Sequence, residues 1–225
     1  MSTRRFLGSL VPNDGVQTYS ALLLLCGVAM LFAIPFAARV SQHSLFRSFY
    51  VPSMFLFLYT FLLTLLGMSR GGAVAAQDRT IRASIAIALQ VLVGQLLVLP
   101  YLIYVRAVLP TSGPRIAMIA VYAFLVGFLA GLIGHRLECR AIDQRKPALL
   151  RKAVLVLAYY LAPFALNLAF GNRVALLSLL SPIGALLHIL ERGSATSTIV
   201  AFAIPIAMIA LQLLRMRRIV QEAST

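Results

Sequence analysis

The chain has 225 residues, a net charge of +14, 61% hydrophobic residues and only 12% charged residues. Soluble domains contain roughly 45–50% apolar and about 25% charged residues. The composition therefore excludes an ordinary soluble domain and indicates a protein of the membrane.

The apolar residues are gathered in runs of about 18 to 23 positions, the length that a helix needs to cross about 30 Å of hydrocarbon. Lipid offers no hydrogen bonds to an open backbone, so runs of this length favour α-helices over barrel strands. We predict an all-α integral membrane protein with one transmembrane domain over residues 1–225. Its six transmembrane helices are expected at 20–38, 50–68, 83–105, 116–134, 153–170 and 195–214.

The N-terminus carries Arg4 and Arg5 ahead of the first apolar run, as a secretory signal does. The apolar region of a signal has about 7–15 residues, and this run is longer. We therefore expect an uncleaved first span.

The second connection is "SRGGAVAAQDRTIRAS", residues 69–84. Gly71 and Gly72 are expected to break the second span, and the alanines that follow are good helix formers. This pattern permits a short helix along the inner membrane face, presenting charged and amide side chains to a cytoplasmic partner. An ordinary topological loop is equally compatible with the composition.

The fourth span contains "LVGFLAGLIG", with Gly127 and Gly131 four residues apart and Gly134 one turn further on. Small residues at this spacing let a second helix approach closely. We predict a helix-packing face here, which carries no information about a substrate.

The segment at 174–190, "VALLSLLSPIGALLHIL", is interrupted by Pro182, Gly184 and His188. The Ser-Pro pair disfavours one straight helix. We expect a re-entrant outer hairpin between the fifth and sixth spans. A seventh crossing would spread the basic residues more evenly over the two sides.

With six spans, most of the 20 Lys and Arg residues fall on one side, at both ends of the chain and in the second and fourth connections. The positive-inside rule then places both termini in the cytoplasm. We expect a multi-pass protein of the cell (cytoplasmic) membrane. The arginines flank spans one by one, as topology and lipid headgroups require, so the bilayer and not nucleic acid is the expected partner of this charge.

A catalytic centre is not expected. The six acidic residues lie in connections or tails, and the histidines His43, His135 and His188 have no metal-ligand spacing. We therefore expect no catalytic residue, no metal or haem and no cofactor in this chain.

Polar side chains inside the spans must find partners across helices. Thr60 and Thr64 share one face of the second span, Gln90 and Gln95 lie in the third, and Asn167 lies in the fifth. These groups either hold the bundle together or line a translocation path, and the sequence leaves both open.

The layout resembles the permease subunits of type-2 ATP-binding-cassette exporters. The matching pieces are "AQDRTIRASIAIALQVLVGQLL", with Asp78, Arg79 and Thr80 in the expected places, and "LLSLLSPIGALLHIL". Asp78 stands where the family repeats glutamates, Arg79 replaces a glycine, and Gln95 stands where a lysine is frequent.

The resemblance implies a permease that pairs with a second permease chain, identical or homologous. Separate nucleotide-binding ATPase subunits would carry ATP and magnesium. It implies a short coupling helix that touches the ATPase through Gln77, Asp78, Arg79, Thr80 and Arg82. Cargo would pass between the paired bundles, along walls that carry Thr60, Thr64, Tyr159, Tyr160 and Asn167.

Two other classes remain open. A scaffold or assembly subunit of a larger membrane complex needs polar contacts and basic loops but no path. An integral-membrane enzyme acting on lipid needs an intramembrane acid, base or metal, which the spans lack.

Overall fold

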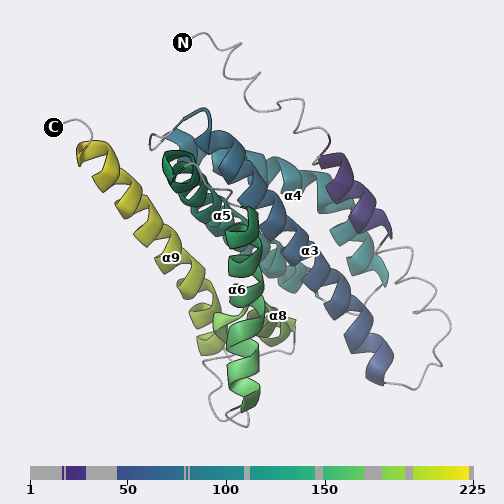
Figure 1. Ribbon diagram of the computed structural model, residues 1–225. Helices are drawn as coiled ribbons and strands as arrows, with labels where there is room; N and C mark the ends of the chain where they lie inside the picture. Colours follow the sequence, from purple (N-terminus) through teal and green to yellow (C-terminus); the bar gives the residue numbers. More distant parts are fainter. Residues whose placement is uncertain are drawn as a thin grey trace.

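A computed structural model of the protein describes residues 17, 19–28, 45–78, 80, 82–108, 112–144, 149–169, 179–190 and 195–222. Within these ranges the chain is helical apart from turns, and no strand occurs. The all-α prediction is confirmed for this part of the chain (Figure 1).

The helices are the apolar helix Tyr19–Val28, α3 (Leu45–Ala75), α4 (Arg82–Val108), α5 (Gly113–Gln144), α6 (Leu149–Ala169), α8 (Pro182–Leu190) and α9 (Ala195–Glu222). Helix α3 makes its most extensive contact with α5 and also touches α4, α6 and α8. Helix α9 packs on α5 and α8.

Within the described ranges, four segments are long and apolar enough to cross a membrane: Leu56–Ala75, Arg82–Ile103, Gly113–Gln144 and Ala195–Arg217. They overlap the second, third, fourth and sixth predicted spans and indicate a multi-pass membrane protein. Helix α6 covers the predicted fifth span but is not one of these four.

Two predicted elements lie partly outside the described residues. Of the first span, 20–38, the structure describes the portion within the apolar helix Tyr19–Val28. Of the outer hairpin, 174–190, it describes a helical Leu179 and Leu180, a bend at Ser181 and then α8. Helix α8 has nine residues and is surrounded by α3, α5, α6 and α9.

The expected break at Gly71 and Gly72 is wrong, because α3 continues through both glycines to Ala75. After it come a turn at Ala76 and Gln77 and an irregular Asp78, so the described residues of this connection form no separate coupling helix. Most helical stability in proteins comes from tertiary packing rather than propensity. Here Gly71 packs directly on α5, which supplies the stabilisation that its propensity lacks.

The α3–α4 turn, the end of α5, the start of α6 and the end of α9 lie at one end of the bundle, at the top in Figure 1. We call this the basic end, because it carries Arg82, Arg140, Arg151, Lys152, Arg215 and Arg217. Helix α8 lies toward the opposite end.

Candidate functional site

The contact between α3 and α5 is made by glycines from both helices. A Cβ on Gly67 would overlap the carbonyl oxygen of Gly127, and a Cβ on Gly71 would overlap that of Gly131. A Cβ on Gly134 would likewise collide with the backbone of Met68. The two backbones are therefore in direct contact along a line that we call the glycine seam.

The glycine seam ends at the α3–α4 turn, which carries the residues expected to meet an ATPase. The amides of Gln77 and Asp78 both donate to the carbonyl of Val74, at 2.9 and 2.8 Å. The Thr80 amide donates to Asp78 Oδ1 at 2.8 Å, and the Arg82 amide to Thr80 Oγ1 at 3.3 Å. Asp78 thus closes a local turn, and Thr80 caps the start of α4.

His135 of α5 fastens this turn to the bundle. Its Nε2 lies 2.9 Å from the carbonyl oxygen of Asp78, so the ring donates to that oxygen as the Nε2–H tautomer. The ring is 3% exposed and follows Gly134 directly. The turn is therefore held at its middle by α5 as well as at its two ends by α3 and α4.

The turn still presents polar groups to the outside. Gln77, Thr80 and Arg82 are exposed, and Asp78 is half-buried. Arg79, which was also expected to contact the ATPase, lies outside the described residues. The described residues of this set therefore lie together at the α3–α4 turn and the first residue of α4.

Arg70 falls in the connection predicted at 69–84, but the structure places it inside a helix. It lies inside α3, is 2% exposed, and its guanidinium sits 5.4 Å from the centre of the Tyr19 ring. Tyr19 in turn donates its hydroxyl to the carbonyl of Gln90 at 2.9 Å. A charge near the end of a membrane helix is thus covered by an aromatic ring, in cation–π geometry.

Three of the expected path residues are joined by hydrogen bonds. Thr60 Oγ1 lies 2.9 Å from the carbonyl of Leu56, and Thr64 Oγ1 lies 2.7 Å from that of Thr60. Because the single Thr64 proton is directed to the Thr60 carbonyl, Tyr160 donates its own proton to Thr64 Oγ1 at 2.8 Å. This chain of bonds links α3 to α6.

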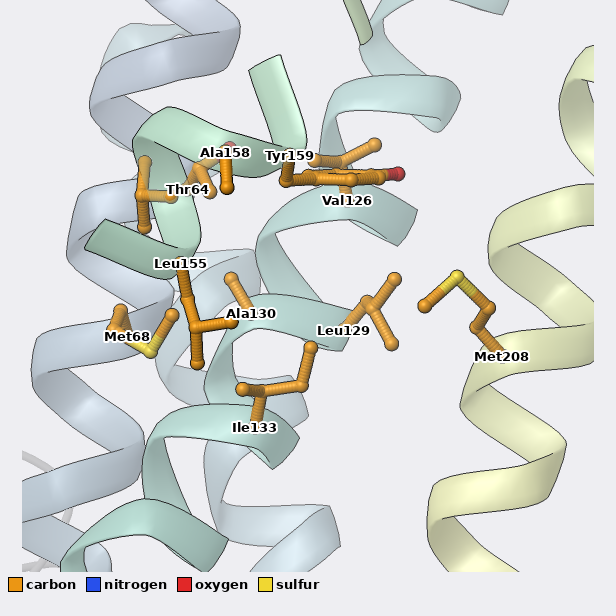
Figure 2. A pocket seen from close by; sticks show the side chains of 11 residues that line it. Thr64, Met68, Val126, Leu129, Ala130, Ile133, Leu155, Ala158, Tyr159 and Met208 are labelled. Atoms are coloured by element: carbon orange, nitrogen blue, oxygen red, sulfur yellow. The ribbon is translucent and has the colours of Figure 1, made fainter. Parts of the chain in front are cut away.

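Tyr159 lines a cavity beside this chain of bonds (Figure 2). The cavity has a volume of about 230 Å³ and lies on α5 between α6 and α9, with Thr64 and Met68 of α3 at one side. Its walls are otherwise aliphatic, so it suits an apolar occupant. The side chain of Asn167 lies outside the described residues, although its backbone belongs to α6.

An ion pair stands between α5 and α6 at the basic end. Lys152 Nζ binds Glu138 Oε2, and the two side chains are 15% and 30% exposed. Both groups border Gly72 of α3. Elsewhere in the described part of the chain, no three His, Cys, Asp or Glu side chains gather as a metal site would require.

Sequence reasoning overlooked several of these residues. Gly67 and Gly71 have the same four-residue spacing as Gly127 and Gly131, and this was the available signal for the partner face. The bond from His135 to Asp78 joins residues far apart in sequence, and no local pattern indicates it.

Comparison with known proteins identifies no relative. No protein-family model, no curated protein and no solved structure matches the chain.

Proposed function

We propose that this chain is the membrane-spanning permease subunit of an ATP-driven exporter, coupled to a separate ATPase at the basic end. The observation that carries the proposal is the α3–α4 turn, which has exposed polar groups outside and the His135 bond inside. A force applied to this turn acts on α3, α4 and α5 together. The rigid glycine seam would carry it along α3 and α5.

In this proposal the surface for the ATPase consists of Gln77, Asp78, Arg79, Thr80 and Arg82. The rigid turn takes the place of the coupling helix that the family resemblance implied. Asp78 and the two arginines provide charge-assisted contacts that fix the register of the partner. ATP and magnesium belong to that partner, and a second permease chain completes the path.

The proposed topology has six spans, with both termini in the cytoplasm and the basic end facing it. Helix α6 would be the fifth span, since its 21 residues cover about 30 Å at a rise of about 1.5 Å per residue. The first span would continue from the helix Tyr19–Val28 through 29–38, and the segment at 174–190 would be re-entrant. The membrane would be the cell membrane.

The proposed cargo is apolar or amphipathic. The cavity beside Tyr159 has aliphatic walls, and the neighbouring hydroxyls of Thr64 and Tyr160 bond to each other. Such walls suit hydrocarbon better than an ion or a sugar.

The test is purification of the tagged full-length chain in mild detergent, with mass spectrometry of the proteins that co-purify. We expect a stoichiometric partner with a nucleotide-binding phosphate loop, lost in the double variant Asp78→Ala and Arg79→Ala. The matched control is Arg140→Ala with Asp143→Ala, which removes one base and one acid from the end of α5. Recovery of the chain without any ATPase, or equal loss in both double variants, would contradict the proposal.

One observation favours a second candidate, a scaffold subunit of a larger membrane complex. The hydroxyls of Thr60, Thr64 and Tyr160 bond to backbone and to one another, which is how polar groups hold a bundle together. The scaffold predicts co-purification of other membrane subunits without an ATPase. It also predicts that the double variant Asp78→Ala and Arg79→Ala co-purifies with the same membrane subunits as the wild type.

A further inference from the structure

Two cavities lie along the line where α3 and α6 face each other, and we call the two together the α3–α6 groove. At the basic end the groove widens to a chamber of about 420 Å³, bordered by Ser69, Gly72, Glu138 and Lys152. Further along lies a second chamber of about 340 Å³, bordered by Phe57, Leu58 and Phe61 of α3, Leu157, Tyr160 and Leu161 of α6, and Ile183 of α8. We call these the polar chamber and the apolar chamber.

The linings of the two chambers follow one another along α3 and along α6, because the two helices run antiparallel. On α3, Phe61 of the apolar chamber is one turn from Leu65 of the polar chamber. On α6, Val156 of the polar chamber is adjacent to Leu157 of the apolar chamber. Leu65, Leu157 and Leu161 are 39%, 50% and 53% exposed, so the groove is open toward the surrounding lipid.

The dimensions of the groove match one leaflet of a bilayer. Ser69 and Leu58 are eleven residues apart on α3, which at a rise of about 1.5 Å per residue is about 16 Å. Half of the hydrocarbon core is about 15 Å. With Ser69 and Lys152 at headgroup depth, an acyl chain reaching the bilayer centre would end in the apolar chamber.

The polar chamber offers both a cation and an anion. Lys152 has three donors and gives one to Glu138 Oε2, while the carboxylate has a second oxygen. Phosphate complements the ammonium, and a primary amine complements the carboxylate. A purely anionic headgroup would face repulsion from Glu138, and a trimethylammonium group has no N–H to donate.

We propose that the α3–α6 groove binds one zwitterionic phospholipid with a phosphoethanolamine headgroup. Its phosphate accepts from Lys152 and from the Ser69 hydroxyl, and its amine donates to Glu138. One acyl chain lies between α3 and α6 and ends in the apolar chamber. This site is independent of any ATPase, and it stands whether or not the chain transports a cargo.

The test is native mass spectrometry of the full-length protein in detergent, supplied with equal amounts of phosphatidylethanolamine, phosphatidylcholine and phosphatidylglycerol with identical acyl chains. We expect one ethanolamine lipid to be retained about tenfold more tightly than the choline lipid, the difference expected from one hydrogen bond to a charged group. Equal retention of the three lipids, or preference for the anionic one, would overturn the proposal.

Two variants locate the headgroup. Lys152→Met is expected to weaken retention of the ethanolamine lipid, and Glu138→Gln to remove its advantage over the choline lipid. The matched control is Arg151→Met, which removes an exposed charge one residue away on α6. An equal loss in Arg151→Met and Lys152→Met would show general charge attraction and overturn the site.

The acyl chain is located with a phosphatidylethanolamine that carries a photoreactive diazirine near the end of one chain. We expect cross-links at Leu157, Leu161 and Phe61. The experiment uses the wild-type protein, so its result does not depend on whether a variant folds. Equal labelling of the exposed α9 residue Ile206, which lies nine residues before Arg215 of the basic end, would show a non-specific lipid annulus and overturn the proposal.

Discussion

Helix α3 packs against α5 and against α6 in opposite ways. Toward α5 it presents Gly67 and Gly71, and the two backbones touch. Toward α6 it presents large side chains such as Phe57 and Phe61, and the chambers of the groove remain between the helices. Their direct links are confined to few places, including the bond of Thr64 to Tyr160.

The comparison shows how residue size decides the rigidity of a helix pair in a membrane. Lipid is as apolar as the side chains, so helices gain little from burying them, and close packing supplies the attraction instead. Small residues give that packing to α3 and α5. Among the described residues, helix α6 has no such backbone contact with α3, and it is held by larger side chains, such as Val156 and Tyr160 packed with Met68, and by a few polar bonds.

The largest expected effect comes from a methyl group placed in the glycine seam. In Gly71→Ala the new Cβ meets the backbone of Gly131 and His135, which cannot move aside without displacing α5. We expect a loss of about 1–3 kcal/mol in the free energy of unfolding, the range for overpacked cores. Denaturation of the protein in mixed micelles measures it.

Gly72→Ala is the matched control, one residue further along the same helix. Its Cβ meets the flexible end of Lys152, which can shift. We expect stability within about 1 kcal/mol of the wild type, because the helix propensity of alanine offsets the displaced lysine. Equal destabilisation by the two alanines would contradict the contrast between the two faces of α3.

The next effect concerns the α3–α4 turn. His135→Ala removes the buried donor to the Asp78 carbonyl, at a cost of about 1–3 kcal/mol for the unsatisfied acceptor where water does not replace it. We expect faster hydrogen exchange at the amides of Gln77 and Asp78, measured by mass spectrometry. His188→Ala in α8 is the control, and it should leave these amides unchanged.

A smaller effect is expected at the link from α3 to α6. Tyr160→Phe and Thr64→Val each break the bond between them, and such bonds in membrane bundles contribute about 0.6 kcal/mol on average. The double variant should therefore be less destabilised than the sum of the single variants. Thr60→Val, whose bond stays within α3, should be additive with Tyr160→Phe. Full additivity of the first pair would show that the bond contributes nothing.

The smallest effect is expected at the ion pair of Lys152 and Glu138, whose side chains are 15% and 30% exposed. Glu138→Gln should change the free energy of unfolding by about 1 kcal/mol, because the glutamine keeps a side-chain oxygen that accepts from Lys152. Thermal unfolding in detergent measures this change. A loss as large as that of Gly71→Ala would mean that α6 is held mainly by this pair.

The helical class and the positions of four apolar spans could be predicted because both follow from local composition. The end of α3 could not, since Gly71 reads as a breaker in isolation and becomes part of a helix only against Gly131. Arg70 is a second example, because only the fold brings the Tyr19 ring over its guanidinium. The missed residues are those whose partners are distant in sequence.

The difference between the α3–α5 contact and the α3–α6 contact can be measured directly by double electron–electron resonance. Cys26 and Cys139 are replaced first, and pairs of spin labels are then introduced into the protein in lipid nanodiscs. One label at the exposed Gln77 is paired with Arg140 on α5 or with Leu150 on α6. We expect a narrow distance distribution for the α5 pair that does not depend on lipid. For the α6 pair we expect a broader distribution that narrows when phosphatidylethanolamine is present. Equal widths for the two pairs in every lipid would contradict the account.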